Sequence, residues 1–196
     1  MNHIWKQYSL IKFIFFFSFC FASNPLNSWI NNNKDILSND FKSASIDLEI
    51  HSKFSDQFNN EKHWVKVYLG KNKKFRIEFR NRIVTSDGVT WSVYDQASNQ
   101  LFLQYPDKKI ERLLFVWSKI NRIKAFPIKK INDNEYEIKL FDKNNFTRLY
   151  FNKNDLENIL TINQNLEIKI SNIKLKKEKS INLSIGNIDT EIFDLR

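Results

Sequence analysis

The sequence predicts a mainly β protein of the α+β class, a single curled antiparallel sheet with amphipathic helices on its apolar face. Three observations predict this fold class. Several segments alternate apolar and polar residues with a period of two, as strands with one buried face do. Two other segments carry apolar residues at helical spacing. A Ser-Asp-Gly sequence at 86–88 joins two runs rich in Val, Thr, Trp and Tyr, which is typical of a tight turn between two strands.

The N-terminal residues 1–22 are expected to be a secretory signal peptide. Lys6 and Lys12 precede the short apolar run 13–21, and small residues follow it. Cleavage is expected after Ala22. The run is shorter than the roughly 20 apolar residues of a membrane span, and an uncleaved anchor is the alternative.

Residues 23–196 are expected to form one domain with its own core. Cys20 is the only cysteine, so removal of the signal leaves no disulfide. Phe19 stands where a lipoprotein box needs a small residue, which argues against lipidation at Cys20. The formal net charge is +9, and loss of Lys6 and Lys12 with the signal lowers it to +7. A basic exported protein points to an anionic membrane surface or an acidic protein partner, because export argues against nucleic acid.

The first helix is expected to begin directly after the signal. Asn24 can act as the N-cap and Pro25 as the first helical residue. The apolar residues that follow recur at roughly helical spacing through a polar stretch, which predicts one amphipathic helix. These residues are Leu26, Trp29, Ile30, Leu37 and Phe41.

The strands are predicted from alternation. The segments with clear alternation are 46–50, 75–80, 135–140 and 166–171. Less regular strand candidates are 63–69, 90–94, 100–105, 146–152 and 158–163.

A second amphipathic helix is predicted over residues 110–120, IERLLFVWSKI, inserted among the strands. Ile110, Leu113, Leu114 and Trp117 follow the spacing i, i+3, i+4 and i+7. No repeat or long linker divides the chain.

Residues that carry catalysis are scarce, so we expect no enzyme, no cofactor and no metal site. His51 and His63 belong to separate strands and lack the companions of a metal site. Glycines occur only at 70, 88 and 186, which excludes a Gly-rich phosphate loop and a Gly-x-Ser-x-Gly elbow.

Residues 75–102, FRIEFRNRIVTSDGVTWSVYDQASNQLF, resemble the signature region of the LolA family, the periplasmic carriers of outer-membrane lipoproteins. The resemblance implies an unclosed β-barrel covered by helices, with an apolar cavity between sheet and helices. The residues that match the family pattern, in order, are Phe75-Arg76, Ser86-Asp87-Gly88, Tyr94-Asp95 and Gln100.

Two positions depart from the family pattern. The Arg-Pro of the family falls on Lys71-Asn72, so Lys71 is the candidate for locking the helical lid, without the planar fork of an arginine. The tryptophan of the family falls on Ser92, whereas Trp91 lies one position earlier and faces the other side of its strand.

The resemblance predicts that the apolar face lines a cavity for acyl chains and that the helices form its movable lid. The alternative is an ordinary filled core, because alternation looks the same in both. The predicted ligand-binding residues are Phe75, Ile77, Phe79 and Trp91 on the strands and Trp29, Ile30, Leu113 and Trp117 on the helices.

The resemblance implies a monomeric periplasmic carrier. It would accept acylated lipoproteins from an inner-membrane ABC-type release complex and deliver them to an outer-membrane acceptor or to the outer membrane itself. The alternatives are a regulatory module that senses lipoproteins or lipids without passing them on, and a carrier of free lipid. The basic cluster KLKKEK at 174–179 is interpreted as a solvated loop, or else as a docking site for anionic lipid or an acidic partner.

Overall fold

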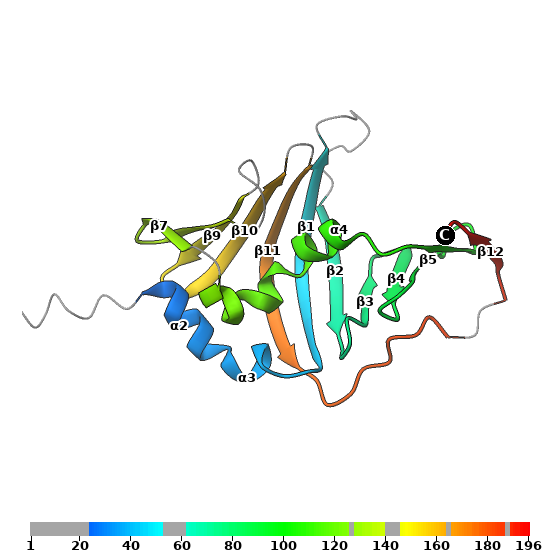
Figure 1. Ribbon diagram of the computed structural model, residues 1–196, viewed down its shortest axis with the longest axis horizontal. Helices are drawn as coiled ribbons and strands as arrows, with labels where there is room; N and C mark the ends of the chain where they lie inside the picture. The colour runs from blue at the N-terminus through cyan, green and yellow to red at the C-terminus, as the bar shows by residue number, and fades with distance from the viewer. Residues whose placement is uncertain (1–23, 53–61, 126–127, 140–145, 164–165, 187–188) are drawn as a thin grey trace, which may run out of the picture.

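The computed structural model (Figure 1) describes residues 24–52, 62–125, 128–139, 146–163, 166–186 and 189–196. The predicted signal peptide at 1–22 and Cys20 lie outside the described residues. No helix in the described ranges is long and apolar enough to cross a membrane.

The described strands form one sheet of twelve, in the order β12-β6-β5-β4-β3-β2-β1-β11-β10-β9-β8-β7. The edge strands β7 and β12 lie at opposite ends of the molecule (Figure 1), so the curled sheet is not closed into a barrel, as predicted. The strands are β1 (Lys42–Ser52), β2 (Lys62–Leu69), β3 (Phe75–Glu78), β4 (Arg82–Ser86), β5 (Trp91–Asp95), β6 (Gln100–Gln104), β7 (Ile128–Asn132), β8 (Glu135–Ile138), β9 (Phe146–Asn152), β10 (Asp155–Asn163), β11 (Leu166–Lys177) and β12 (Glu191–Asp194).

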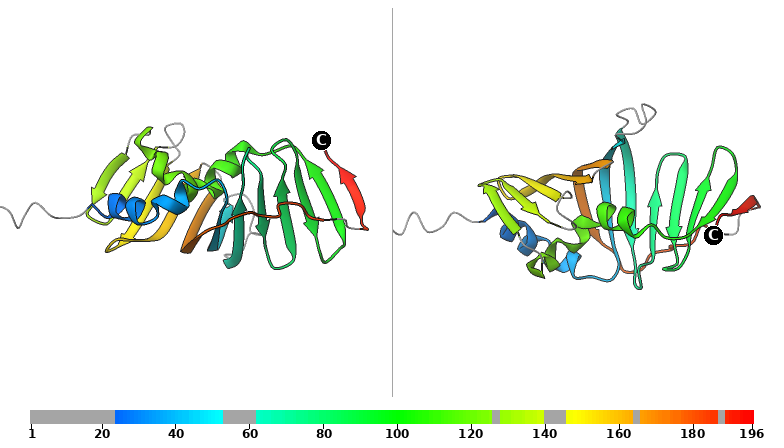
Figure 2. Two further views of the ribbon diagram at one scale, coloured as in Figure 1. Left: turned by 90° about the horizontal axis from the view of Figure 1, so that it is seen from below. Right: turned by 45° about the horizontal axis from the view of Figure 1, so that its top comes forward.

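The sheet is antiparallel except at one edge, where β12 runs parallel to β6. After β11 the chain crosses the strands that lie between β11 and β12 in the sheet, as Figure 2 shows. Such a crossover permits parallel pairing, which a hairpin would not. The crossing segment lies on the face toward which Arg76 points, because the Arg76 guanidinium donates a hydrogen bond to the Ser184 carbonyl. Phe75 and Ile77 point to the opposite face.

The first predicted helix is present but broken. It consists of α2 (Pro25–Asn32) and α3 (Lys34–Leu37), and Phe41 lies beyond both. Asn24 caps α2 as predicted, since its side-chain oxygen accepts hydrogen bonds from the backbone N–H groups of Leu26 and Asn27. The break falls at Asn33, whose side-chain amide donates to the Trp29 carbonyl at 2.9 Å beside its own backbone N–H at 3.1 Å.

The second predicted helix is also divided. Helix α4 (Lys108–Leu114) is followed by a 3₁₀ helix, η1 (Val116–Ala125). The Ser118 backbone N–H and hydroxyl both donate to the Phe115 carbonyl, three residues back, which is the spacing of a 3₁₀ helix. Trp117 and Ile120 are fully buried at that same spacing. The α-helical spacing predicted from Ile110 to Trp117 is therefore wrong beyond Leu114.

The helices of the described ranges all lie on one face of the sheet (Figure 1). Helix α2 contacts β10, while α3 contacts β11 and η1. Helix α4 lies over the middle of the sheet, near β1 and β2 (Figure 1). In the register of the sheet, one row of side chains crosses β1, β11, β10, β9 and β8 under these helices and is at most 2% exposed. Its members are Leu48, Ile170, Ile159, Leu149 and Tyr136.

Each predicted strand segment falls on a strand of the sheet, with ends shifted by a few residues. Strand β7 was missed, because its Ile128 and Ile131 lie in a basic stretch and all its side chains are exposed. The interpretation of 174–179 as a solvated loop is wrong, since β11 continues to Lys177. Lys174 and Lys176 pair with residues of β1, and Leu175 packs against the core.

The turn between β4 and β5 has the predicted chemistry. Asp87 Oδ1 accepts hydrogen bonds of 2.8 Å from the backbone N–H groups of Val89 and Thr90, and these bonds hold the pKa of Asp87 below its usual value. Gly88 has φ +102°, which side-chain-bearing residues rarely adopt. A Cβ on Gly88 would also lie 2.7 Å from the Asn72 carbonyl oxygen of the β2–β3 turn. The glycine therefore allows two neighbouring turns to touch.

We predict that Gly88→Ala lowers the free energy of unfolding by about 2–3 kcal/mol, through backbone strain and the clash with Asn72. Gly186→Ala is the control, because Gly186 has φ +90° but nothing within 4 Å of an added Cβ. It should lose only about 1 kcal/mol in urea denaturation. If both variants lose the same free energy of unfolding, the contact between the two turns does not contribute to stability.

Candidate functional site

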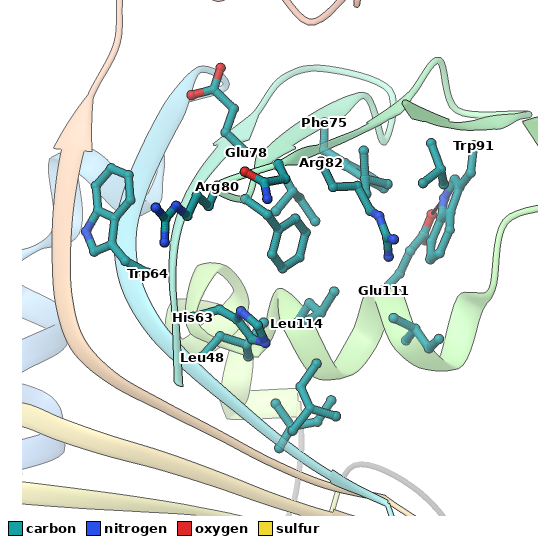
Figure 3. Close-up of a pocket in the computed structure, with 18 of the residues that line it drawn as sticks. Leu48, His63, Trp64, Phe75, Glu78, Arg80, Arg82, Trp91, Glu111 and Leu114 are labelled. Carbon is teal, nitrogen blue, oxygen red and sulfur yellow. Dashed lines mark hydrogen bonds between the residues drawn. The ribbon is translucent and has the colours of Figure 1, made fainter. Parts of the chain in front are cut away.

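A cavity of about 1380 Å³ lies between helix α4 and strands β1–β5 (Figure 3). Such a volume exceeds the ~300–1,000 Å³ typical of small-molecule sites, so the cavity suits a larger ligand. Its wall is mainly apolar, with Leu48 and Ile77 from the sheet and Leu114 from α4. Carboxylate, guanidinium and imidazole groups lie at the strand ends on one side.

An aromatic cluster joins the sheet to the helical segment. The Phe75 ring lies edge-on to the Trp91 ring, with centroids 5.6 Å apart. It also contacts the Phe115 ring at 4.9 Å. Phe115 is the residue between α4 and η1, so this contact fixes the point where the two helices meet. Such aromatic pairs contribute about 0.5–1.5 kcal/mol beyond their buried area.

One hydrogen bond tethers α4 across the cavity. The indole Nε1 of Trp91 donates to Glu111 Oε1 at 3.2 Å, and both residues line the cavity. Glu111 lies on α4 and Trp91 begins β5. The tether and the Phe75–Phe115 contact therefore help to hold the helix over the sheet, together with Ile110 and Leu114, which pack against the core.

The charged groups at the cavity edge are largely paired. Arg82 donates to Asp95 at 3.1 Å, and this bond keeps the pKa of Asp95 below its usual value. Arg76 bonds Glu78 at 2.8 Å. His63 packs edge-on against the Phe79 ring at 6.3 Å. Paired charges at the rim leave the apolar interior as the dominant chemical character of the site.

The structure brings the four predicted strand residues together. Phe75, Ile77, Phe79 and Trp91 all line the cavity. Trp91 is on the cavity face and 5% exposed. Whether these side chains touch a ligand stays a prediction.

Three of the four predicted helical residues lie elsewhere. Trp29 and Trp117 are buried in the core, and Ile30 packs against that core, but none of the three lines the cavity. The side chain of Leu113 lies outside the described part of the chain. Sequence reasoning missed Phe115, Val84 and Val93, which do line the cavity. The alternation of β4 and β5 could have indicated the two valines.

Trp117 is fully buried, and its Nε1 finds no hydrogen-bond partner among the described residues. A buried, unpaired N–H costs about 1–3 kcal/mol. The packing of η1 on the sheet is thus less stable than its buried apolar area alone would make it.

Lys71, the predicted lid lock, forms an ion pair of 3.2 Å with Asp40, and both side chains are about 60% exposed. No hydrogen bond from Lys71 to a helix carbonyl is present among the described residues. Such a bond is made instead by Lys42, whose ammonium donates to the Leu37 carbonyl at the end of α3 at 2.6 Å. In this structure the lysine that bonds to the end of α3 is therefore Lys42.

No group of three or more His, Cys, Asp or Glu side chains in the described ranges is arranged to hold a metal ion.

The sequence matches no protein-family model and no curated protein. The solved structures that are similar in part include the following three. An uncharacterized conserved protein from Thermus thermophilus is 10% identical over 86% of this chain and 98% of its own, with a TM-score of 0.46. A LolA superfamily protein from Nitrosomonas europaea is 8% identical over 79% and 94%, with a TM-score of 0.43. A DUF1329 family protein from Desulfovibrio piger is 9% identical over 81% and 93%, with a TM-score of 0.41. At these TM-scores the similarities do not bear on what the chain binds.

We predict that Lys42→Met lowers the free energy of unfolding by about 1 kcal/mol, because it removes the hydrogen bond to the last turn of α3. Lys71→Met should be indistinguishable from wild type, since an exposed ion pair is screened by water and salt. Urea denaturation and hydrogen exchange of the α3 amides test both variants. If the α3 amides exchange faster in Lys71→Met and not in Lys42→Met, then Lys71 is the residue that holds α3.

We predict that Trp91→Phe accelerates hydrogen exchange of the α4 amides by about fivefold. The phenyl ring keeps the contact with Phe75 but cannot donate to Glu111, and a lost hydrogen bond of this kind is worth about 1 kcal/mol. Glu111→Gln keeps an acceptor oxygen and should fall between wild type and Trp91→Phe. Unchanged α4 exchange in Trp91→Phe would show that the tether does not hold the helix.

Proposed function

We propose that this protein is an exported carrier that holds the acyl chains of lipoproteins in the cavity under α4 and shuttles them from the inner to the outer membrane. The observation that carries the proposal is the cavity itself, about 1380 Å³ in volume and lined mainly by apolar side chains. The resemblance of residues 75–102 to the LolA signature supports the choice of cargo.

Acyl chains need such a cover in water. Exposure costs about 0.8 kcal/mol per methylene, so one chain of ~16 carbons costs roughly 12 kcal/mol to expose. A carrier must offset much of this cost and still release its cargo. Complete burial of three chains would exceed the practical affinity limit of about −20 kcal/mol. A cavity open on one side, under a helix that can move, meets both demands.

Helix α4 is the element best placed to act as a lid. Its residues Ile110 and Leu114 face the cavity, with Phe115 directly after them. If α4 moves away from β5, these side chains and Phe75 become available to an acyl chain. The Trp91–Glu111 hydrogen bond sets part of the free energy of opening, which must be only a few kcal/mol if the ligand is to shift it.

The partners follow from the proposed route. The protein would receive its cargo from an inner-membrane ABC-type release complex and pass it to an outer-membrane acceptor or to the outer membrane itself. The formal net charge, +9 for the full sequence and +7 without Lys6 and Lys12 of the expected signal, supports contact with acidic protein surfaces or anionic lipid at either stage.

We predict that Val84→Glu weakens binding of a hexadecanoylated peptide by at least tenfold. A carboxylate on the cavity face would have to be buried against the acyl chain. Ile83→Glu is the matched control, because Ile83 is the preceding residue of β4, equally half-buried, and points to the opposite face. Phe75→Glu should also abolish binding, with circular dichroism to verify folding. Equal binding by Val84→Glu and Ile83→Glu would place the ligand elsewhere.

Transfer between membranes separates a carrier from a sensor that retains its ligand. Inner-membrane vesicles with labelled lipoprotein are mixed with outer-membrane vesicles, and wild-type protein should speed the appearance of label in the second fraction. Val84→Glu should not. Tight binding without transfer would contradict the carrier function and favour a regulatory module.

A further inference from the structure

The apolar floor of the cavity continues beyond the cavity, across the part of the sheet that no described helix covers. In the sheet register, Ile77 of β3 lies opposite Val84, Val84 opposite Val93, and Val93 opposite Phe102. Phe102 in turn lies opposite Phe193 of the edge strand β12. Side chains paired in this way share one face of the sheet, so the five residues form a continuous row. We call this row the β3–β12 strip.

The exposure of the strip changes along its length. Ile77 is 3% exposed, whereas Val84, Val93, Phe102 and Phe193 are all only half-buried. The change coincides with the extent of the helices. Among the described residues, α4 reaches the start of β5 through the Trp91–Glu111 hydrogen bond, and no helix lies over β6 and β12, as Figure 1 shows. The uncovered end of the strip is therefore an apolar surface without a partner in the described part of the chain.

The far end of the strip is ordered by an aromatic stack. The Phe102 and Phe193 rings are 5.2 Å apart and inclined by 20°. This stack depends on the parallel pairing of β12 with β6. That pairing is supported by the hydrogen bond from the Leu195 N–H to the Leu103 carbonyl at 2.8 Å and by the bond from Thr190 to the Asn99 carbonyl. Residues 190–195 therefore hold the Phe102 and Phe193 rings in place at this edge of the sheet.

The strip has the length of an acyl chain. From Ile77 to Phe193 it crosses four strand spacings, about 19 Å at ~4.8 Å each. One leaflet of a bilayer provides about 15 Å of hydrocarbon, half of its ~30 Å core. A chain from a membrane lipid therefore fits along the strip with one end under α4 and the other at the Phe102–Phe193 stack.

We propose that the β3–β12 strip is the binding track for one acyl chain of about sixteen carbons, and that Phe102 and Phe193 form the end that distinguishes long chains from short ones. The inference rests on the proposed function and adds the chain length and the residues to it. A ten-carbon chain occupies only the part under α4, because more of its surface is buried there. A longer chain must continue over Val93 to the two phenylalanines.

Thiol protection tests the track directly. With Cys20 changed to Ser, single cysteines are introduced as Val84→Cys, Phe102→Cys and Phe193→Cys. Leu101→Cys and Ile192→Cys are matched controls, since each precedes its partner on the same strand and points to the opposite face. The rate of maleimide labelling is measured with one peptide carrying either a hexadecanoyl or a decanoyl chain.

We expect the hexadecanoyl peptide to slow labelling at 84, 102 and 193 by about tenfold and to leave 101 and 192 unchanged. The decanoyl peptide should protect only 84. The double variant Phe102→Ala/Phe193→Ala should bind the hexadecanoyl peptide about tenfold more weakly and the decanoyl peptide as wild type does.

The outcomes that overturn the inference are distinct. If the hexadecanoyl peptide protects the cysteine at 84 but leaves labelling at 102 and 193 unchanged, the strip is not the binding site of the whole chain. The proposed function is not affected by that result. If neither peptide protects the cysteine at 84, both the inference about the strip and the proposed function are contradicted. Protection at 102 and 193 without ligand, lost on dilution of the protein, would assign the uncovered face to a second copy of the chain.

Discussion

The apolar face of this sheet extends further than the helices that cover it. On β8–β11 the inward side chains lie under α2, α3 and η1, and Leu149 and Ile159 are fully buried. Toward β12 the same face continues through Val93 and Phe102, which are only half-buried. A closed barrel would enclose such a face, but β7 and β12 lie at opposite ends and do not pair. The cavity and the uncovered strip both follow from this mismatch.

The junction between α4 and η1 connects the two halves of that face. Before Phe115 the chain crosses the cavity, and after it Trp117 and Ile120 enter the filled core. Helix α4 is held by the Trp91–Glu111 bond, by the contact of Phe115 with Phe75, and by Ile110 and Leu114, which pack against the core. If α4 is the lid that we propose, its opening leaves Trp29 and Trp117 in place, whereas displacement of either tryptophan would expose part of the core.

Local sequence patterns predicted what depends on neighbours in the chain. The alternation at 75–79 placed Phe75 and Ile77 on one buried face, and Asn24 and Gly88 had the capping and turn roles expected of them. The same patterns did not predict that Asn33 breaks the first helix or that Phe115 ends α4. At Asn33 a side-chain amide shares the Trp29 carbonyl with the backbone, and after Phe115 the hydrogen bonds change to the spacing of a 3₁₀ helix.

By itself the sequence determined the mainly β fold class, most of the strand positions, the N-cap and the β4–β5 turn, and which side chains of the alternating strands face inward. These properties follow from the period of apolar residues and from backbone preferences, which are local. Only the tertiary structure decided which inward residues line a cavity and which fill the core, that Lys42 rather than Lys71 contacts a helix end, and that β12 joins β6 in parallel. Those outcomes depend on contacts between segments far apart in the chain, such as Phe102 with Phe193, for which a single sequence carries no periodic signal.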